Sequence, residues 1–185
     1  TQEGIRYLIR SLGFRRVVFR SVEYRFCAGL HRALYADCLA LPGIPMLYQE
    51  EEIGAFFALR ELNRVRRLLP WMATAEARFL EPGYAAPGVF AAWRTSPQGS
   101  VLCLVNLGGT RQTGTATWPQ TAGQPRPRRI TSVLSGARTP LRRGTFTWEL
   151  GPYDSAFLVP ETAVPDAVAS APSPPSAEPA AAPAA

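Results

Sequence analysis

Apolar residues in the first 70 positions recur at the three- and four-residue spacing of amphipathic helices. The spacing predicts a helix over 27–41, a short buried strand over 44–48 and a second helix that stops at Pro70. The stripe expected to be buried in the first helix comprises Leu30, Leu34, Cys38 and Leu41. The stripe of the second helix comprises Leu59, Leu62, Val65 and Leu69. With an earlier β-prone run over 16–19, this alternation predicts βα units on a parallel sheet.

After residue 78 the pattern changes to short β-prone runs separated by Gly and Pro. Turn signals at this spacing predict an antiparallel β-sandwich over 78–160. The predicted strands are 89–94, 101–106, 111–118, 130–134, 145–150 and 155–159.

Residues 161–185 are almost entirely Ala, Pro and Ser. Such a segment buries too little apolar surface to offset the entropy of ordering, so a disordered tail is expected. The chain is therefore expected to combine an α/β part over 1–72, an all-β part over 78–160 and this tail.

The net charge of +6 comes from scattered arginines. Arg126, Arg128 and Arg129 form the one basic cluster, in a Pro-rich loop without interleaved aromatics, which favours solvated loop charge over nucleic-acid binding. No stretch approaches the roughly 20 apolar residues of a membrane span. We expect a soluble protein with no nucleic-acid and no membrane partner.

The cysteines are odd in number and lack metal-site spacing. Cys27, Cys38 and Cys103 lie among apolar residues, so buried thiols are expected rather than disulfides or metal ligands. This favours a reducing compartment, such as the cytoplasm. With His31 as the single histidine, neither a metal site nor a cofactor is predicted.

The segment from Ala40 to Gly54 carries the most specific motif of the chain. It predicts a helix end, a Pro/Gly turn, a buried strand and a loop with three consecutive carboxylates. In a parallel barrel, the loop that follows a strand lies on the active face. The segment resembles the eighth strand of the α-amylase family of glycoside hydrolases, with the pattern LPGxPxxYxGxExG. The matching residues are Leu41, Pro42, Gly43, Pro45, Tyr48, Glu52 and Gly54. Glu50 stands where the family has glycine.

This resemblance covers about 14–160 and implies the fold. The first part is similar to the last βα units of a TIM-type (β/α)8 barrel. The phrases VFAAWR, VLCLVNL and LGPYDSAFLVP look like the opening hairpin and closing strand of the family's C-terminal β domain. The chain begins at Thr1. We expect a C-terminal fragment whose partner is the missing N-terminal barrel portion.

The resemblance also implies a chemistry that this chain holds only in part. Retaining glycosidases use two carboxyl groups about 5–5.5 Å apart. The family takes these from the fourth and fifth strands, which lie before this chain begins. A third carboxylate comes from the seventh strand, where Glu23 falls, with Ser21 and Val22 in place of the family's Asn and His. Glu23 is either this catalytic carboxylate or an ordinary ion-pair partner of Arg20 or Arg25.

Candidate substrate contacts are few. Tyr48 either stacks on a sugar or packs within the barrel. Glu52 either orients the rim of a substrate cleft or belongs to a surface loop near Arg60 or Arg64. Among the aromatics of the β part, Trp118 is expected to be the exposed platform. Core packing is expected for Trp93 and Trp148, while Tyr153 remains a further candidate.

Two functions follow from the resemblance. In the first, the chain is part of an enzyme that hydrolyses or transfers α-glucosidic bonds of an α-glucan or maltooligosaccharide, and is inactive alone. In the second, it is a non-catalytic glycan-binding or structural descendant of such an enzyme.

Overall fold

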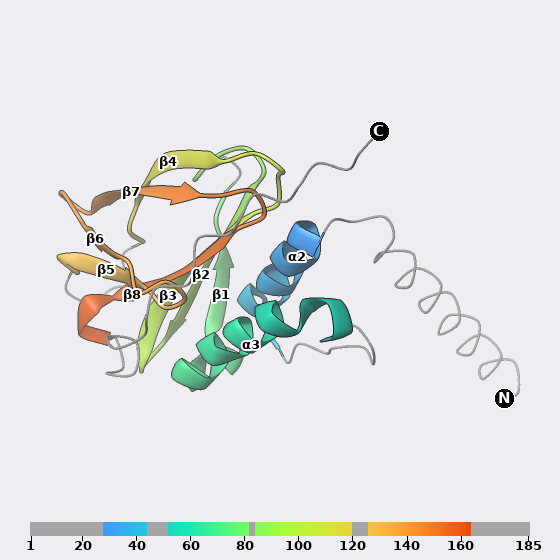
Figure 1. Ribbon diagram of the computed structural model, residues 1–185. Coiled ribbons are helices and arrows are strands. Elements are labelled where there is room, and N and C mark those ends of the chain that lie inside the picture. Colours follow the sequence, from blue (N-terminus) through green and yellow to red (C-terminus); the bar gives the residue numbers. More distant parts are fainter. Residues whose placement is uncertain (1–27, 44–51, 82–83, 120–125, 164–185) are drawn as a thin grey trace, which may run out of the picture.

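The structure is a computed structural model that describes residues 28–43, 52–81, 84–119 and 126–163 (Figure 1). Its helical elements are α2 (Ala28–Ala40), α3 (Glu52–Leu68) and the short 3-10 helices η1 (Pro70–Ala73) and η2 (Glu161–Ala163). Its strands are β1 (Glu76–Phe79), β2 (Val89–Ser96), β3 (Gly99–Asn106), β4 (Gln112–Thr117), β5 (Arg129–Ser132), β6 (Arg138–Pro140), β7 (Thr145–Leu150) and β8 (Ser155–Pro160).

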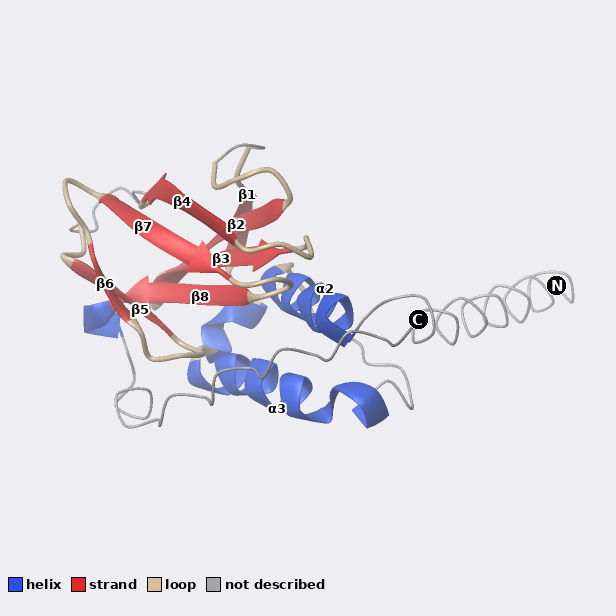
Figure 2. Cartoon of the chain, turned by 45° about the horizontal axis from the view of Figure 1, so that its top comes forward, coloured by secondary structure: helices blue, strands red, loops and turns tan. Residues whose placement is uncertain are grey.

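A six-stranded sheet forms the centre of the described part. Its strand order is β1-β2-β3-β8-β5-β6, and every neighbouring pair is antiparallel. A second sheet, the antiparallel pair β4-β7, lies over one face of it, and α2 and α3 lie over the other face (Figures 1 and 2). The described residues therefore form three layers, and the central sheet is covered on both sides.

Alternate residues of the central strand pair point to opposite faces of the sheet. In the β2–β3 hairpin, Ala92 pairs with Cys103, and Trp93 pairs with Leu102. Cross-strand partners share a face, and successive residues alternate between faces. Consequently Ala92 and Cys103 point to the helices, while Trp93 and Leu102 point to β4 and β7.

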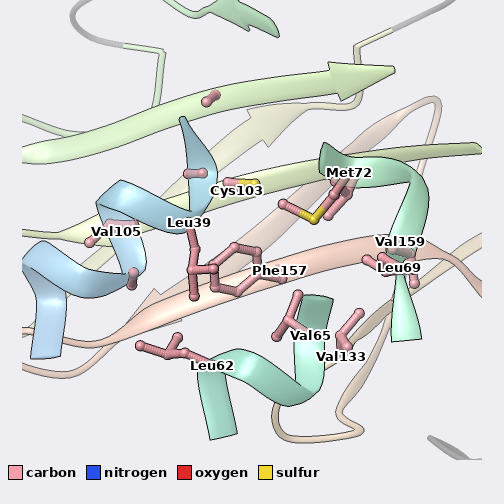
Figure 3. Packing of buried hydrophobic residues seen from close by; sticks show 14 of the residues in the cluster. Leu39, Leu62, Val65, Leu69, Met72, Cys103, Val105, Val133, Phe157 and Val159 are labelled. Atoms are coloured by element: carbon pink, nitrogen blue, oxygen red, sulfur yellow. The ribbon is translucent and has the colours of Figure 1, made fainter. Parts of the chain in front are cut away.

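The core beneath the helices, called here the helix-side core, is made from distant parts of the chain (Figure 3). Leu39 of α2 and Leu62 and Val65 of α3 surround Phe157 of β8, which is fully buried. Met72 of η1 extends this core beyond the end of α3. The helices are thus bound to the sheet through a continuous apolar contact.

The predicted helix over 27–41 is present as α2, but the predicted buried face is wrong. Leu34 is 37% exposed and Cys38 is also exposed, whereas Ala33 and Ala36 are fully buried. Small side chains at these two positions let the helix backbone approach the sheet closely, and Leu39 on the same side of the helix packs against Phe157. Apolar spacing located the helix, but side-chain size decided which face is buried.

The second predicted helix is confirmed in its buried stripe, and Leu59, Leu62, Val65 and Leu69 are all buried. It ends at Leu68, just before Pro70, as expected. Its start differs from the expectation, because Glu52 is the first residue of α3 instead of part of a loop.

All six predicted strands are present, as β2, β3, β4, β5, β7 and β8. Strands β1 and β6 were missed because both are short, mostly exposed and lie at the edges of the sheet. The strands predicted over 16–19 and 44–48 and the tail beyond 163 lie outside the described residues. The barrel remnant, the tail and the division into domains therefore stay predictions.

Of the cysteine predictions, one is confirmed and one is wrong. Cys103 is fully buried as expected, and burial raises the pKa of its thiol to about 12. Cys38 is exposed, so the expectation of a buried thiol is wrong there. Cys27 lies outside the described residues. Within the described part of the chain, no helix is long and apolar enough to cross a membrane.

Candidate functional site

The segment expected to carry the site runs from the end of α2 to the start of α3. The structure describes its first residues, up to Gly43, and its last, from Glu52. Gly43 has a φ of 105°, a left-handed conformation that glycine adopts without steric cost. The glycine that matches the motif is therefore favoured at this position by the backbone conformation.

Arg94 of β2 anchors the end of α2. Its side chain is fully buried, on the helix-facing side of the sheet. One terminal nitrogen, Nη1, donates to the carbonyl of Ala40 at 2.8 Å. The other, Nη2, donates to the carbonyls of Met72 at 2.8 Å and Ala75 at 2.9 Å. One planar guanidinium thus joins the end of α2, η1 and the approach to β1.

A second arginine holds the turn itself. Arg66 of α3 donates from Nη2 to the carbonyl of Gly43 at 2.9 Å. Two arginines, from β2 and from α3, therefore bind carbonyls three residues apart, at Ala40 and Gly43, where the motif begins.

The surroundings of this junction disfavour the positive charge of both arginines. Burial lowers the pKa of Arg94, and the neighbouring charge of Arg66 lowers it further. Burial also lowers the pKa of Arg66. The Nε atoms of both arginines are buried without a hydrogen-bond partner. A buried cation is costly unless paired, so the carbonyl dipoles at Ala40, Met72 and Ala75 are what stabilise Arg94 here.

Asp37 lies one turn before Ala40 on α2. Burial raises the pKa of its carboxyl group, and its Oδ1 is buried without a hydrogen-bond partner. A carboxylate near the C-terminal end of a helix also meets the negative end of the helix dipole. Asp37 is therefore a cost to the fold in its ionised form.

A second contact ties α2 to the sheet at the opposite end of the helix. Tyr153, in the turn before β8, has a φ of 55° and lies against Gly29, where a Cβ atom would come within 2.6 Å of its ring. Asp154 accepts a hydrogen bond from Arg32 at 3.1 Å. The motif GPYDS, which resembles the closing part of a β domain, is thus used for docking α2.

The sequence-predicted site residues are distributed unevenly. Glu23 and Tyr48 lie outside the described residues, so their predicted roles stay predictions. Glu52 begins α3. Its predicted role at the rim of a cleft also stays a prediction.

Trp118 is not an exposed platform, and that expectation is wrong. It is only 7% exposed, and its ring meets Trp93 edge to face at a centroid distance of 4.9 Å. Phe146 approaches it from β7 at 6.4 Å. The strand end that suggested exposure is covered because β4 lies over the central sheet, where Trp93 of β2 meets the ring of Trp118. Trp93 and Trp148 are buried as expected, at 4% and 8% exposure.

The sequence analysis did not single out Arg94, Arg66 or Phe79. Arg94 lies within a run of buried strand positions, and Arg66 follows Leu62 and Val65 on the buried side of α3. An arginine among apolar positions was the signal that could have identified the first two. Phe79, 52% exposed, lies on the unpredicted strand β1, with its ring 6.1 Å from that of Phe90. The described residues contain no group of three or more His, Cys, Asp or Glu side chains placed to hold a metal ion.

No protein-family model matches the chain, and no curated protein matches its sequence. Solved structures match it in three dimensions. The α-amylase from Geobacillus thermoleovorans, complexed with acarbose, matches with a TM-score of 0.62 and 14% identity over 75% of this chain and 34% of that one.

Two further enzymes give the same picture. A noncanonic maltogenic α-amylase from Thermotoga neapolitana matches with a TM-score of 0.55 and 13% identity, over 71% of this chain and 36% of that one. A debranching enzyme from Nostoc punctiforme matches with a TM-score of 0.54 and 16% identity, over 70% of this chain and 30% of that one. The protein thus has a fold found in α-amylase-family enzymes and spans about a third of their length, which fits the C-terminal part of such an enzyme.

Proposed function

We propose that this chain is the C-terminal part of an α-amylase-type enzyme that hydrolyses or transfers α-glucosidic bonds. The observation that carries the proposal is the match to the Geobacillus α-amylase, which covers 75% of this chain but 34% of that enzyme. The motif at 40–54 supports it independently, since it resembles the family's eighth strand and lies between the two helices that pack on the sheet.

In this proposal the β part has a mechanical role. Arg94 and Arg66 fix the start of the motif against the sheet, and α3 fixes its end. Catalytic groups need placement to within a fraction of an ångström, so a rigid frame on both sides of an active-face loop favours catalysis. The substrate is an α-glucan or maltooligosaccharide, contacted through the motif rather than through the buried tryptophans.

Activity requires carboxylates that lie outside this chain. We therefore expect the 185-residue chain alone to show no turnover of maltoheptaose or of an activated α-glucoside above buffer. The same chain supplied with an N-terminal barrel portion, encoded upstream or as a separate polypeptide, gains turnover. Turnover by the chain alone that is lost in Glu23→Gln would overturn the proposal, and unchanged turnover in Glu23→Gln would point to a contaminant.

The second candidate is a non-catalytic glycan-binding protein of the same fold. The departure of Ser21 and Val22 from the family's seventh-strand pattern favours it. Binding of maltoheptaose by the chain alone, with no turnover after the barrel portion is supplied, would replace the first proposal by this one.

A further inference from the structure

One stretch of the chain is strongly basic. Residues 82–148 contain no Asp or Glu, yet they contain eight arginines. Six of these lie within 18 positions and are exposed: Arg126, Arg128, Arg129, Arg138, Arg142 and Arg143. We call this set the arginine ribbon. One of the six, Arg138, also lies 3.6 Å from Oε1 of Glu161, in an ion pair between exposed side chains.

The fold aligns two sequence clusters into this ribbon. In the β5–β6 pair at the sheet edge, Arg129 lies opposite Pro140, and Arg138 lies opposite Thr131. Arg129 and Arg138 therefore share one face of the strand pair. Further along, the carbonyl of Arg128 accepts a hydrogen bond from the amide of Leu141 at 2.9 Å.

The hairpin between β6 and β7 extends the ribbon. Arg142 and Thr145 exchange backbone hydrogen bonds of 2.8 and 3.0 Å around the two-residue turn Arg143-Gly144. A Cβ atom on Gly144 would lie 3.6 Å from the guanidinium of Arg126, which places Arg126 beside this tip. The hairpin tip with Arg126, Arg142 and Arg143 therefore follows directly on the edge strand that carries Arg138.

The tip carries a local conformational cost. Arg143 has a φ of 53° and Gly144 a φ of 85°, the signature of a type I′ turn. Asn and Gly are preferred at its first central position, and a long side chain is disfavoured there. An arginine held in this conformation, at the end of a row of arginines, points to a role for its charge.

We propose that the arginine ribbon binds an anionic polysaccharide, a linear glycan that bears carboxylate, sulfate or phosphate groups. Guanidinium groups pair with such oxyanions through two parallel hydrogen bonds. The inference rests on the proposed function for the choice of a glycan, since the chain has the fold of α-glucan enzymes.

The composition of the ribbon disfavours other partners. No aromatic residue occurs between Arg126 and Gly144, so there is no platform for the bases of a single-stranded nucleic acid. Its larger apolar residues, Leu134 and Leu141, are half-buried against the two cores, so an acidic protein partner finds no apolar anchor.

The test compares carboxymethyl-amylose with neutral amylose, which share one backbone and differ in charge. The ribbon variant is Arg129→Gln/Arg138→Gln/Arg143→Gln. The matched control is Arg60→Gln/Arg67→Gln/Arg78→Gln, which removes the same charge at three exposed positions outside the ribbon. We expect the ribbon variant to bind carboxymethyl-amylose at least about tenfold more weakly, the control within about twofold, and wild-type binding to weaken steeply as salt rises.

A single substitution separates binding from folding. Arg143→Asn places a preferred residue in the left-handed turn, so we expect a higher melting temperature together with weaker binding. Equal losses in the ribbon variant and in the control would show a general charge effect and overturn the proposal. Tighter ribbon-dependent binding of a 20-base-pair DNA duplex or of phosphatidylglycerol vesicles would replace the polysaccharide by that partner.

Failure of this inference is distinguishable from failure of the proposed function. If neutral amylose binds and carboxymethyl-amylose binds no more tightly, the ribbon proposal is wrong and the proposed function stands. If carboxymethyl-amylose binds through the ribbon and the chain with its barrel portion never turns over maltoheptaose, the ribbon stands and the proposed function is wrong.

Discussion

The two faces of the central sheet are built from different residues and closed by different parts of the chain. The face under β4 and β7 is filled by large aromatics, with Trp93, Trp118, Phe146 and Trp148 buried in one cluster. The helix-side core contains small and branched residues, and Phe157 is its one large fully buried ring among the described residues.

This difference reflects how each layer is held. The β4-β7 layer comes from residues close in sequence to the strands it covers, and bulky rings fill the gap between two sheets about 10 Å apart. The helix layer precedes the β part in the chain and is held at close range by alanines and by the buried charge of Arg94. The face under β4 and β7 stabilises the β part itself, and the helix-side core connects the β part to the candidate site.

The largest expected effect lies on the aromatic face. Trp118→Ala removes a buried ring from between Trp93 and Phe146, and we expect it to lower the free energy of unfolding by about 3–5 kcal/mol in urea titrations. Trp118→Phe refills part of the space and should recover part of the loss. A stable Trp118→Ala protein that binds amylose more weakly would restore the exposed-platform interpretation and break the comparison.

The next effect lies at the junction under the helices. Arg94→Met leaves the carbonyls of Ala40, Met72 and Ala75 without this donor, and we expect a loss of roughly 3 kcal/mol, since each unsatisfied buried acceptor costs about 1–3 kcal/mol. Arg94→Lys keeps the charge without the planar guanidinium and should reduce the stability by a smaller amount. Arg60→Met, at an exposed position of α3, serves as the control and should stay near the wild-type value. A loss below 1 kcal/mol for Arg94→Met would mean that the junction contributes little.

A smaller effect tests the close approach of α2. Ala36→Leu places a large side chain on the fully buried face of the helix, and overpacking of this kind costs about 1–3 kcal/mol. Leu34→Ala, on the exposed face of the same helix, should change stability by less than about 0.5 kcal/mol. Thermal melts of the two variants compare the faces directly, and the reverse ranking would support the face predicted from apolar spacing.

The smallest effect concerns pH. Because burial raises the pKa of Asp37 above its ordinary value of 3.8, the folded protein holds this proton more tightly than the unfolded chain. Its carboxyl therefore lowers stability as pH rises through and above that value. Asp37→Asn should raise stability by about 0.5 kcal/mol at pH 7, with no gain near pH 3. Unfolding at both pH values tests this, and a gain of equal size at pH 3 would assign it to another cause.

Much of the secondary structure followed from the sequence. The period of the apolar residues located α2, α3 and six strands, because burial of one face imposes that period locally. Edge strands β1 and β6 carry no such period, since they are mostly exposed, and they were missed. The motif over 40–54 pointed to the fold that the solved structures share.

Side-chain environments depended on the tertiary structure. Trp118 stands beside a proline at the end of β4, and only the packing of this strand on the central sheet decides that it is buried. Leu34 and Ala36 both lie on α2, and only the distance between helix and sheet decides that the alanine is the one buried. Arg129 and Arg138 lie nine positions apart in the sequence, and the pairing of β5 with β6 places them on one face.

The sequence by itself determined where the helices and most strands lie, and it identified the motif that suggests α-glucan chemistry. The tertiary structure decided which face of α2 is buried, that Trp118 is covered, and that Arg94 joins α2 to the sheet. The physical reason is that periodicity is a local property of a chain, whereas burial and charge pairing depend on which distant segments are packed together.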